Sequence, residues 1–411
     1  MSRMANGEWR MANGKHGIAR SLAAIVCALG LAASLSAQTA DDDDLQTTEE
    51  RRARLAEAAE ETGRLQDQID AELMMKRGAE YLLASQEKDG GWASQGGPGI
   101  TCLALKALVQ EPSVGADHPA VERGIRFVLR FQRDDGGVYS AGGLLKNYET
   151  SVALSMFAAM KGDRYKAQIT KAQQFLKKLQ WDEGEDKSID DVWYGGAGYG
   201  RGKRPDLSNT QMMLEALHDS GLPKDDPTYK KALVFIRRCQ MLGEHNDQPF
   251  ARGSNQGGFV YTPANGGESK AGEIEVGERK ELRSYGSMTY AGFKSMLFAG
   301  LTKDDPRVKA ALEWIGRYWT LDFNPNMPTR QSAEGLFYYY QVFGRAMQAC
   351  GEDTITDQVG REHNWRRELV SKLAEIQRDD GSWVNEADRW MEGHPALTTA
   401  YAMLAARAAC P

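Results

Sequence analysis

From residue 71 to the C-terminus, apolar and polar residues recur with a helical period in two kinds of alternating segment. Segments of the first kind have one apolar face and one charged face, which predicts amphipathic helices with one side in solvent. Segments of the second kind are rich in Ala, Gly, Met and Leu, and a helix of that composition must be buried on several sides. The sequence therefore predicts outer helices alternating with inner ones.

The outer segments cover 72–86, 118–132, 164–180, 228–240, 305–319 and 363–377. The inner segments begin at Ile100, Glu149, Asn209, Met288, Gln331 and Thr398. Aligning the inner segments places a hydroxyl residue at one shared position: Thr101, Thr150, Thr210, Thr289, Ser332 and Thr399. The pattern is that of six helical hairpins.

A motif is repeated where the outer segments end. Three copies are full: Arg77–Trp92 (RGAEYLLASQEKDGGW), Arg123–Tyr139 and Glu368–Trp383. Two are weaker: Lys171–Trp181 and Lys231–Gln240. Internal repeats of helical hairpins either stack into an open solenoid or close into a ring. The small residues of the inner segments let helices approach closely, which favours closure. We therefore expect an all-α fold, an α6/α6 toroid with a central cavity.

The repeated motif resembles the QW signature of the terpene cyclase and protein prenyltransferase superfamily. The matching residues are Arg77, Gly78, Tyr81 or Leu82, Gln86, Gly90 and Trp92, and the similarity covers residues 71–411. The fifth repeat departs from it, with Trp319 where Gln would fall. In that family the Gln and the aromatic residues tie neighbouring outer helices together, so the resemblance implies a structural role for them here. A fold does not by itself settle function.

Residues 1–37 have the layout of a secretory signal peptide, with basic residues before an apolar run and small residues after it. The alternative is an uncleaved N-terminal anchor. Cleavage predicts an exported protein, periplasmic or extracellular, with an acidic linker and leader helix over 38–70. No second long apolar run follows, so we expect no transmembrane span after cleavage, although contact with a membrane surface stays open.

The formal net charge of −6 comes without a basic patch, which argues against nucleic acid as a partner. The cysteines beyond the signal segment are scattered, without metal-ligand spacing. They are expected to be buried thiols, with a bridge between Cys350 and Cys410 as the alternative. No cofactor and no metal are expected.

A triterpene cyclase of the resembled family carries an acid motif, DxDDT, at the head of an inner helix, where the middle Asp donates a proton. The best match here is Asp206–Thr210, DLSNT, in which Ser208 stands at the donor's place. A serine hydroxyl cannot protonate an alkene, so standard squalene cyclisation is not expected. Asp206 survives as a candidate acid. Asp190 and Asp191 are either a substitute acid pair or ordinary exposed loop carboxylates.

The prenyltransferase branch of the family holds zinc with an Asp-x-Cys pair and a distant His. No cysteine here has an Asp two places before it. His394 does precede the last inner segment, as a ligand-binding residue or as a helix cap. Zinc chemistry is therefore not expected.

Two long insertions, 181–207 and 241–284, are expected to form the rim of the cavity, because insertions in repeat proteins collect on one face. The predicted ligand-binding residues are Trp193, Tyr194, Thr210, Tyr285, Tyr290, Tyr338, Trp390 and His394. Two hypotheses follow. The first is a binding protein whose cavity accepts an apolar, isoprenoid-like small molecule or a peptide. The second is an enzyme, either a non-standard terpene cyclase or transferase or a glycan-active enzyme, using loop carboxylates.

Overall fold

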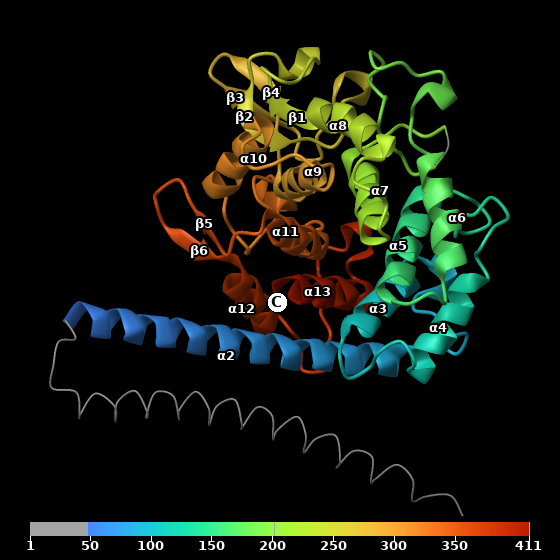
Figure 1. Ribbon diagram of the computed structural model, residues 1–411. Coiled ribbons are helices and arrows are strands. Elements are labelled where there is room, and N and C mark those ends of the chain that lie inside the picture. The colour runs from blue at the N-terminus through green and yellow to red at the C-terminus, as the bar shows by residue number, and fades with distance from the viewer. Residues whose placement is uncertain (1–47, 201, 411) are drawn as a thin grey trace, which may run out of the picture. The chain divides into compact units, whose positions relative to one another are not determined.

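The computed structural model describes residues 48–200 and 202–410, which are mainly helical with a few short strands (Figure 1). The chain divides into two compact units, Met1–Leu73 and Met74–Pro411. The signal peptide expected over residues 1–37 and the first part of the linker lie outside the described residues. Among the helices of residues 48–200 and 202–410, none combines the length and the apolar composition that a transmembrane span requires.

The first unit contains most of helix α2 (Thr48–Ser85). Its residues are strong helix formers, and its side chains are mostly exposed, Leu55 at 59%. Side-chain pairs four residues apart stabilise α2. For example, the Gln66 amide donates a hydrogen bond to the Asp70 carboxylate at 2.8 Å. The end of α2, from residue 74 on, belongs to the second unit and serves there as the first outer helix.

Six inner helices of the second unit carry the apolar segments. They are α3 (Gly99–Gln110), α5 (Lys146–Ala159), α7 (Leu207–Asp219), α9 (Gly286–Phe298), α11 (Leu336–Cys350) and α13 (Pro395–Ala409). Each packs against the next along the chain, and α13 packs against α3 (Figure 1). The order of packing among these helices therefore returns to its starting point.

The other helices of the second unit lie against the inner ones. They are α4 (Pro119–Leu129), α6 (Lys166–Lys177), α8 (Pro227–Cys239), α10 (Pro306–Arg317) and α12 (Trp365–Glu375). Each packs on the inner helix that precedes or follows it, as α6 does on α5 and α12 on α13. Three of them begin with proline after an N-cap, His118, Asp226 or Asp305, whose side chain accepts a hydrogen bond from the first turn.

The repeated glutamines join successive outer helices. Gln86 donates its amide to Gly90 O in its own motif and to Ala120 O in α4, at 2.9 and 2.8 Å. The later copies repeat these two bonds: Gln180 to Gly195 and Thr228, Gln240 to Gly257 and Arg307, and Gln377 to Gly381 and Met74. The motif is a structural connector, as the sequence resemblance implied.

The shared hydroxyl position also has one repeated role. Thr101 accepts the backbone N–H of Trp92 at 3.0 Å, and so holds the end of the motif against the inner helix. Thr150, Thr210, Thr289 and Thr399 accept the corresponding N–H groups of Val138, Ala197, Phe259 and Trp383. Ser332 does not, because α11 begins only at Leu336 and Ser332 lies in a preceding turn, where it donates to Thr329 O. The alignment of the fifth repeat was therefore wrong.

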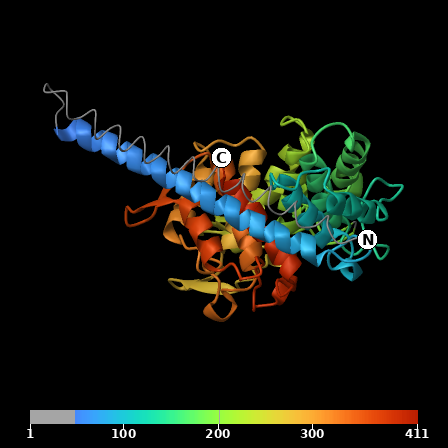
Figure 2. The ribbon, with the colours of Figure 1, turned by 90° about the horizontal axis from the view of Figure 1, so that it is seen from below.

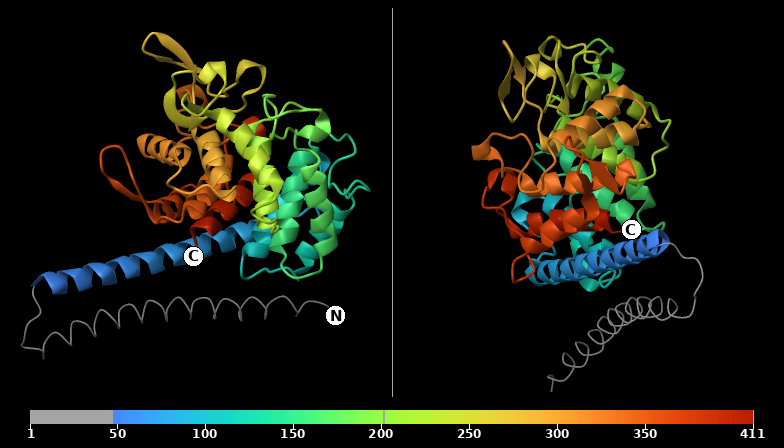
Figure 3. Two further views of the ribbon diagram at one scale, coloured as in Figure 1. Left: turned by 45° about the horizontal axis from the view of Figure 1, so that its top comes forward. Right: turned by 90° about the vertical axis from the view of Figure 1, so that its left-hand side faces the viewer.

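Three short antiparallel hairpins accompany the helices, although the sequence predicts an all-α fold. They pair β1 (Gln240–Leu242) with β2 (Asn255–Phe259), β3 (Glu273–Val276) with β4 (Arg279–Leu282), and β5 (Thr354–Thr356) with β6 (Glu362–Asn364). Met241, Ala251 and Val260 form a small buried core at the first hairpin, and Phe250 and Leu282 pack against it. The hairpins lie at the edge of the helical body (Figures 2 and 3). Their strands are too short to show a period of two in the sequence.

Cys102, Cys239 and Cys350 are buried free thiols, so the alternative of a bridge between Cys350 and Cys410 is not realised. Burial raises the pKa of the Cys102 and Cys239 thiols well above the ordinary value. These cysteines serve as small apolar side chains.

Candidate functional site

A cavity of about 320 Å³ lies where the inner helices begin, and it is here called the tyrosine cavity. Residues in or just before the first turns of all six inner helices line it, among them Ile100, Tyr148, Ser208, Met288 and Tyr338. Its aromatic lining consists of Tyr148, Tyr199, Tyr261, Tyr285, Tyr338, Tyr401 and Trp390. Its volume falls at the small end of the range of about 300–1,000 Å³ for ligand pockets.

At the head of α7, a serine and not an aspartate faces this cavity. Ser208 and Asn209 belong to the lining. Asp206 is the N-cap of α7 and only 2% exposed, and it does not line the cavity. Its carboxylate accepts the backbone N–H of Asn209 at 2.8 Å, and both of its oxygens accept the Asn209 amide at 2.9 and 3.1 Å. Asp206 is thus turned into the protein.

Burial raises the pKa of Asp206 to about 6, although hydrogen bonds from Asn209 and Tyr261 act in the opposite direction. Tyr199 and Tyr261 stand on the cavity side of this carboxyl group, because both line the cavity and both interact with the Asp206–Asn209 pair. A proton on Asp206 therefore has aromatic hydroxyl groups between it and the cavity.

Ser208 is part of a hydroxyl cluster on the cavity wall. Its Oγ lies 3.0 Å from the hydroxyl of Tyr338, and Gln211 donates its amide to the same hydroxyl at 2.9 Å. Tyr338 in turn lies edge-on to Tyr401, with ring centroids 6.2 Å apart. The cluster can donate or accept a hydrogen bond to a polar end of a ligand, but it offers no acid.

Two buried carboxyl groups in the lining were missed by the sequence analysis. Glu149 is 2% exposed and accepts hydrogen bonds from Ser140 N at 2.9 Å and Ser140 Oγ at 2.7 Å. Burial raises its pKa. A carboxylate within an otherwise apolar inner segment, directly before the shared threonine, was the signal that could have found it.

The second missed carboxyl is Glu392, which is 1% exposed. It accepts the Asn385 amide at 2.7 Å and the backbone N–H groups of Phe337 and Tyr338 at 3.2 and 2.7 Å. Burial raises the pKa of Glu392 overall, although these hydrogen bonds act in the opposite direction. Since Phe337 and Tyr338 open α11, the main role of Glu392 is to hold the start of that helix against the 385–392 loop.

Trp390 and Met391 lie side by side in the lining and both have left-handed backbone conformations, with φ of 68° and 66°. They are 51% and 53% exposed. Two consecutive non-glycine residues in this conformation are strained, and strain of this kind collects at ligand clamps and active sites. Trp390 therefore sits where the cavity meets solvent.

The predicted residues of the first insertion lie away from the tyrosine cavity lining. Asp190 is exposed, and Asp191 pairs with Lys187 at 2.8 Å and caps Trp193 N. Burial raises the pKa of Asp191, but these partners outweigh it and lower the pKa overall. Trp193 lies edge-on to Trp181, and Tyr194 donates to Glu183. The insertion is tied down on its own side by Arg238, which donates to two of its carbonyl groups.

Three further predicted residues are structural. Tyr290 is fully buried between the rings of Tyr339 and Phe343. Thr210 takes part in the repeated hydroxyl contact, and His394 caps α13 through Ala396 N at 3.3 Å. Of the predicted set, the structure brings together Tyr285, Tyr338 and Trp390. No group of three His, Cys, Asp or Glu side chains with metal-binding geometry occurs in the described ranges.

The protein thus consists of paired outer and inner helices around a small aromatic cavity with buried carboxyl groups in its wall. The sequence matches no protein-family model and no curated protein sequence. Among solved structures, the chain is similar to terpene cyclases, the class that its QW-like motifs resemble. The extent of this similarity is given by three of these structures.

One is a variant of the type II terpene cyclase MstE from Scytonema in complex with geranylgeranyl dihydroxybenzoate (substrate), 14% identical, with 84% of this chain and 99% of that chain covered and a TM-score of 0.49. Another MstE variant, in complex with merosterolic acid A (product), is 14% identical over 84% and 99% of the two chains, with a TM-score of 0.47. A protein from Actinoplanes is 17% identical over 82% and 99%, with a TM-score of 0.47. Likeness at this level says nothing by itself about activity.

Proposed function

We propose that this chain is an exported binding protein, an α6/α6 toroid that holds a small apolar, isoprenoid-like ligand in the tyrosine cavity without standard cyclase or zinc prenyltransferase chemistry. The observation that carries the proposal is the pair Ser208 and Asp206. A serine is on the cavity wall, and the neighbouring carboxyl group is turned away and bonded to Asn209. An apolar ligand would be surrounded by tyrosine rings and would meet no proton donor at this place.

Closure of the helices into a ring is supported by the cyclic order of inner-helix packing and by the bond from Gln377 to Met74. The apolar ligand is supported by the lining, in which aromatic rings and Ile100, Met288 and Leu397 predominate. A peptide ligand is less well supported, because the cavity volume of about 320 Å³ holds little more than one small molecule. Export remains an inference from residues 1–37.

The test is native mass spectrometry of the protein purified from its own host, followed by titration of the stripped protein with farnesol and geranylgeraniol. We expect an apolar adduct that is lost on organic extraction, and binding of one alcohol per chain. A saccharide adduct or a metal ion alone, with no binding of either alcohol, would contradict the proposal.

A second function, a cyclase with an unusual acid, is favoured by one observation: Glu149 lines the cavity and burial raises its pKa. A protonated Glu149 would transfer its proton to an alkene carbon, leaving a carboxylate and a carbocation that the tyrosine rings stabilise. Gas chromatography after incubation with each alcohol decides between the two functions. Cyclised products that vanish in Glu149→Gln would establish the enzyme, and recovery of unchanged alcohol favours the binding protein.

A further inference from the structure

A second cavity, of about 580 Å³, lies where the inner helices end. Residues from the last turns of α3, α5, α7, α11 and α13, or just beyond them, line it. Four cationic side chains and one carboxylate are in its wall: Lys106, Lys161, Arg345, Arg407 and Asp219. It is here called the basic cavity. None of these residues lines the tyrosine cavity.

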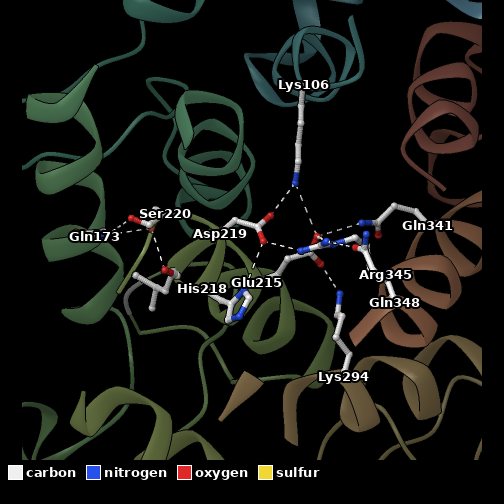
Figure 4. A network of polar contacts seen from close by, with 11 residues as sticks. Lys106, Gln173, Glu215, His218, Asp219, Ser220, Lys294, Gln341, Arg345 and Gln348 are labelled. Carbon is white, nitrogen blue, oxygen red and sulfur yellow. Dashed lines mark hydrogen bonds and ion pairs between the residues drawn. The ribbon is translucent and has the colours of Figure 1, made fainter. Parts of the chain in front are cut away.

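A buried charge network includes Lys106, Asp219 and Arg345 of the cavity wall (Figure 4). Lys106 pairs with Asp219 at 3.1 Å, and Arg345 pairs with Asp219 at 2.6 Å and with Glu215 at 3.3 Å. Lys294 pairs with Glu215 from the other side. Burial raises the pKa of Glu215 and of Asp219, but the surrounding cations outweigh it and hold the pKa of both groups well below ordinary values. Both carboxylates are therefore ionised and already taken by cations.

The cations, in contrast, retain unused donors. Arg345 spends three of its five N–H groups, on Glu215, Asp219 and Gln348. The side chain of neither Arg407 nor Lys161 makes a hydrogen bond or ion pair with any other residue that the structure describes. Gln348 accepts from Arg345, which leaves its amide N–H groups pointing away from that bond. The wall therefore has a surplus of positive charge and of donors.

The rest of the wall combines polar side chains, among them Gln110, Ser155 and Gln341, with apolar ones such as Val109, Ala158 and Leu404. A cavity of this volume is larger than a bare inorganic ion requires. We propose that the basic cavity binds a small organic oxyanion, whose phosphate or carboxylate head contacts Arg407 and Arg345 and whose apolar body lies against these side chains. Arginine suits such a head because its planar fork matches two oxygens at once.

Cations at these positions also offset the negative ends of the inner helices, which accounts for their presence in the fold. Arg407 stands in the last turn of α13 and serves this role there, whereas no basic residue stands in the last turn of α3 or α11. The contact with the helix end leaves the guanidinium donors of Arg407 available, and the side chains of Arg407 and Lys161 make no ion pair within the described ranges. The arrangement at these two residues is that of a site prepared for an anion.

The test is isothermal titration of the full chain at low salt with phenyl phosphate, benzoate, inorganic phosphate and phenol. We expect phenyl phosphate or benzoate to bind once per chain, inorganic phosphate more weakly, and phenol not at all. Whichever of the two aromatic anions binds more tightly identifies the head group. Binding should weaken as salt is raised, since exposed charges are screened.

The decisive variant is Arg407→Gln, which we expect to weaken binding about 10-fold or more, equivalent to a loss of about 1.4 kcal/mol in binding free energy. The matched control is Arg317→Gln, a similar change in the last turn of an outer helix, which should leave affinity unchanged. Circular dichroism checks that both variants fold. Lys161→Gln, exposed and outside the network, is a second variant expected to weaken binding. Equal affinity in wild type and Arg407→Gln, or no binding of either aromatic anion, would overturn the proposal.

Discussion

Gln377 donates its side-chain amide to the backbone carbonyl of Met74 at 3.0 Å, although 303 positions separate them in the sequence. The same side chain bonds Gly381 O in its own motif at 2.9 Å. The corresponding bonds of Gln86, Gln180 and Gln240 join their motifs to the outer helix that follows in the chain. The last copy instead reaches the first outer helix, and it joins the sixth hairpin to the first together with the bonds from Arg77 to Arg378 O and Asp379 O.

We predict that Gln377→Ala lowers the free energy of unfolding by about 1–3 kcal/mol, because two carbonyl groups lose a buried donor. Chemical denaturation followed by circular dichroism measures the change. Gln174→Ala, at an exposed glutamine of α6, is the control and should change stability by less than about 0.5 kcal/mol. Equal effects of the two variants would mean that the closing bond contributes nothing.

Gly381 tests the same junction from the backbone. Its φ is +88°, and a Cβ there would lie 2.4 Å from Arg77 O, in backbone that cannot move aside easily. Gly360 has a similar φ of +84° but open space around it. We predict that Gly360→Ala costs about 1–2 kcal/mol from conformation alone, and that Gly381→Ala costs clearly more. Thermal denaturation of both variants gives the comparison, and similar melting temperatures would contradict it.

Asp206 predicts a dependence of stability on pH. Its folded-state pKa, about 6, exceeds the ordinary value of 3.8, so the folded protein binds more protons than the unfolded chain between these pH values. The stabilising contribution is complete below about pH 4 and is lost as the pH rises through about 6, on the order of 3 kcal/mol in all. Asp206→Asn should remove this slope between pH 4 and 7. Asp225→Asn, at an exposed loop carboxylate, should retain it, and a retained slope in Asp206→Asn would contradict the assignment.

Trp390 is expected to cover a bound ligand. We predict that Trp390→Ala weakens binding of geranylgeraniol about 10-fold, because a large aromatic contact at the mouth of the tyrosine cavity is lost. Tyr290→Phe is the control, since Tyr290 lies outside the cavity lining. Loss of its hydroxyl should leave affinity unchanged. Fluorescence or calorimetric titration of both variants checks this pair.

The charge network is predicted to be sensitive to the loss of one partner. Lys294→Met leaves Glu215 with one fewer cation in the interior, where both side chains are almost wholly buried. We expect a loss of about 3–5 kcal/mol in the free energy of unfolding. The double variant Lys294→Met with Glu215→Gln should recover part of that loss. Lys309→Met, at an exposed and weak ion pair, should be nearly neutral.

The sequence by itself determined the repeated parts of this protein. The alternation of outer and inner helices and the shared threonine position follow from local periodicity and from a motif repeated often enough to be aligned. The tying role of Gln86 and its copies was implied by the resemblance of that motif to the QW signature. The fifth repeat was misplaced because its motif has Trp319 in place of Gln and its inner helix starts late, at Leu336. Where a repeat lacks the Gln of the motif, periodicity alone does not give the residue at which its inner helix begins.

Only the tertiary structure decided the site. Tyr285, Tyr338 and Trp390 were expected near the cavity and lie there. Trp193, Tyr194 and Asp191 instead contact Trp181, Glu183 and Lys187 of their own insertion. Glu149 and Glu392 come from distant repeats and meet the cavity only because inner helices of successive hairpins begin at the same end. The basic cavity arises likewise from helices that end together. A pattern along the chain specifies which face of a helix is buried, whereas the neighbour that each buried side chain meets depends on how the hairpins assemble.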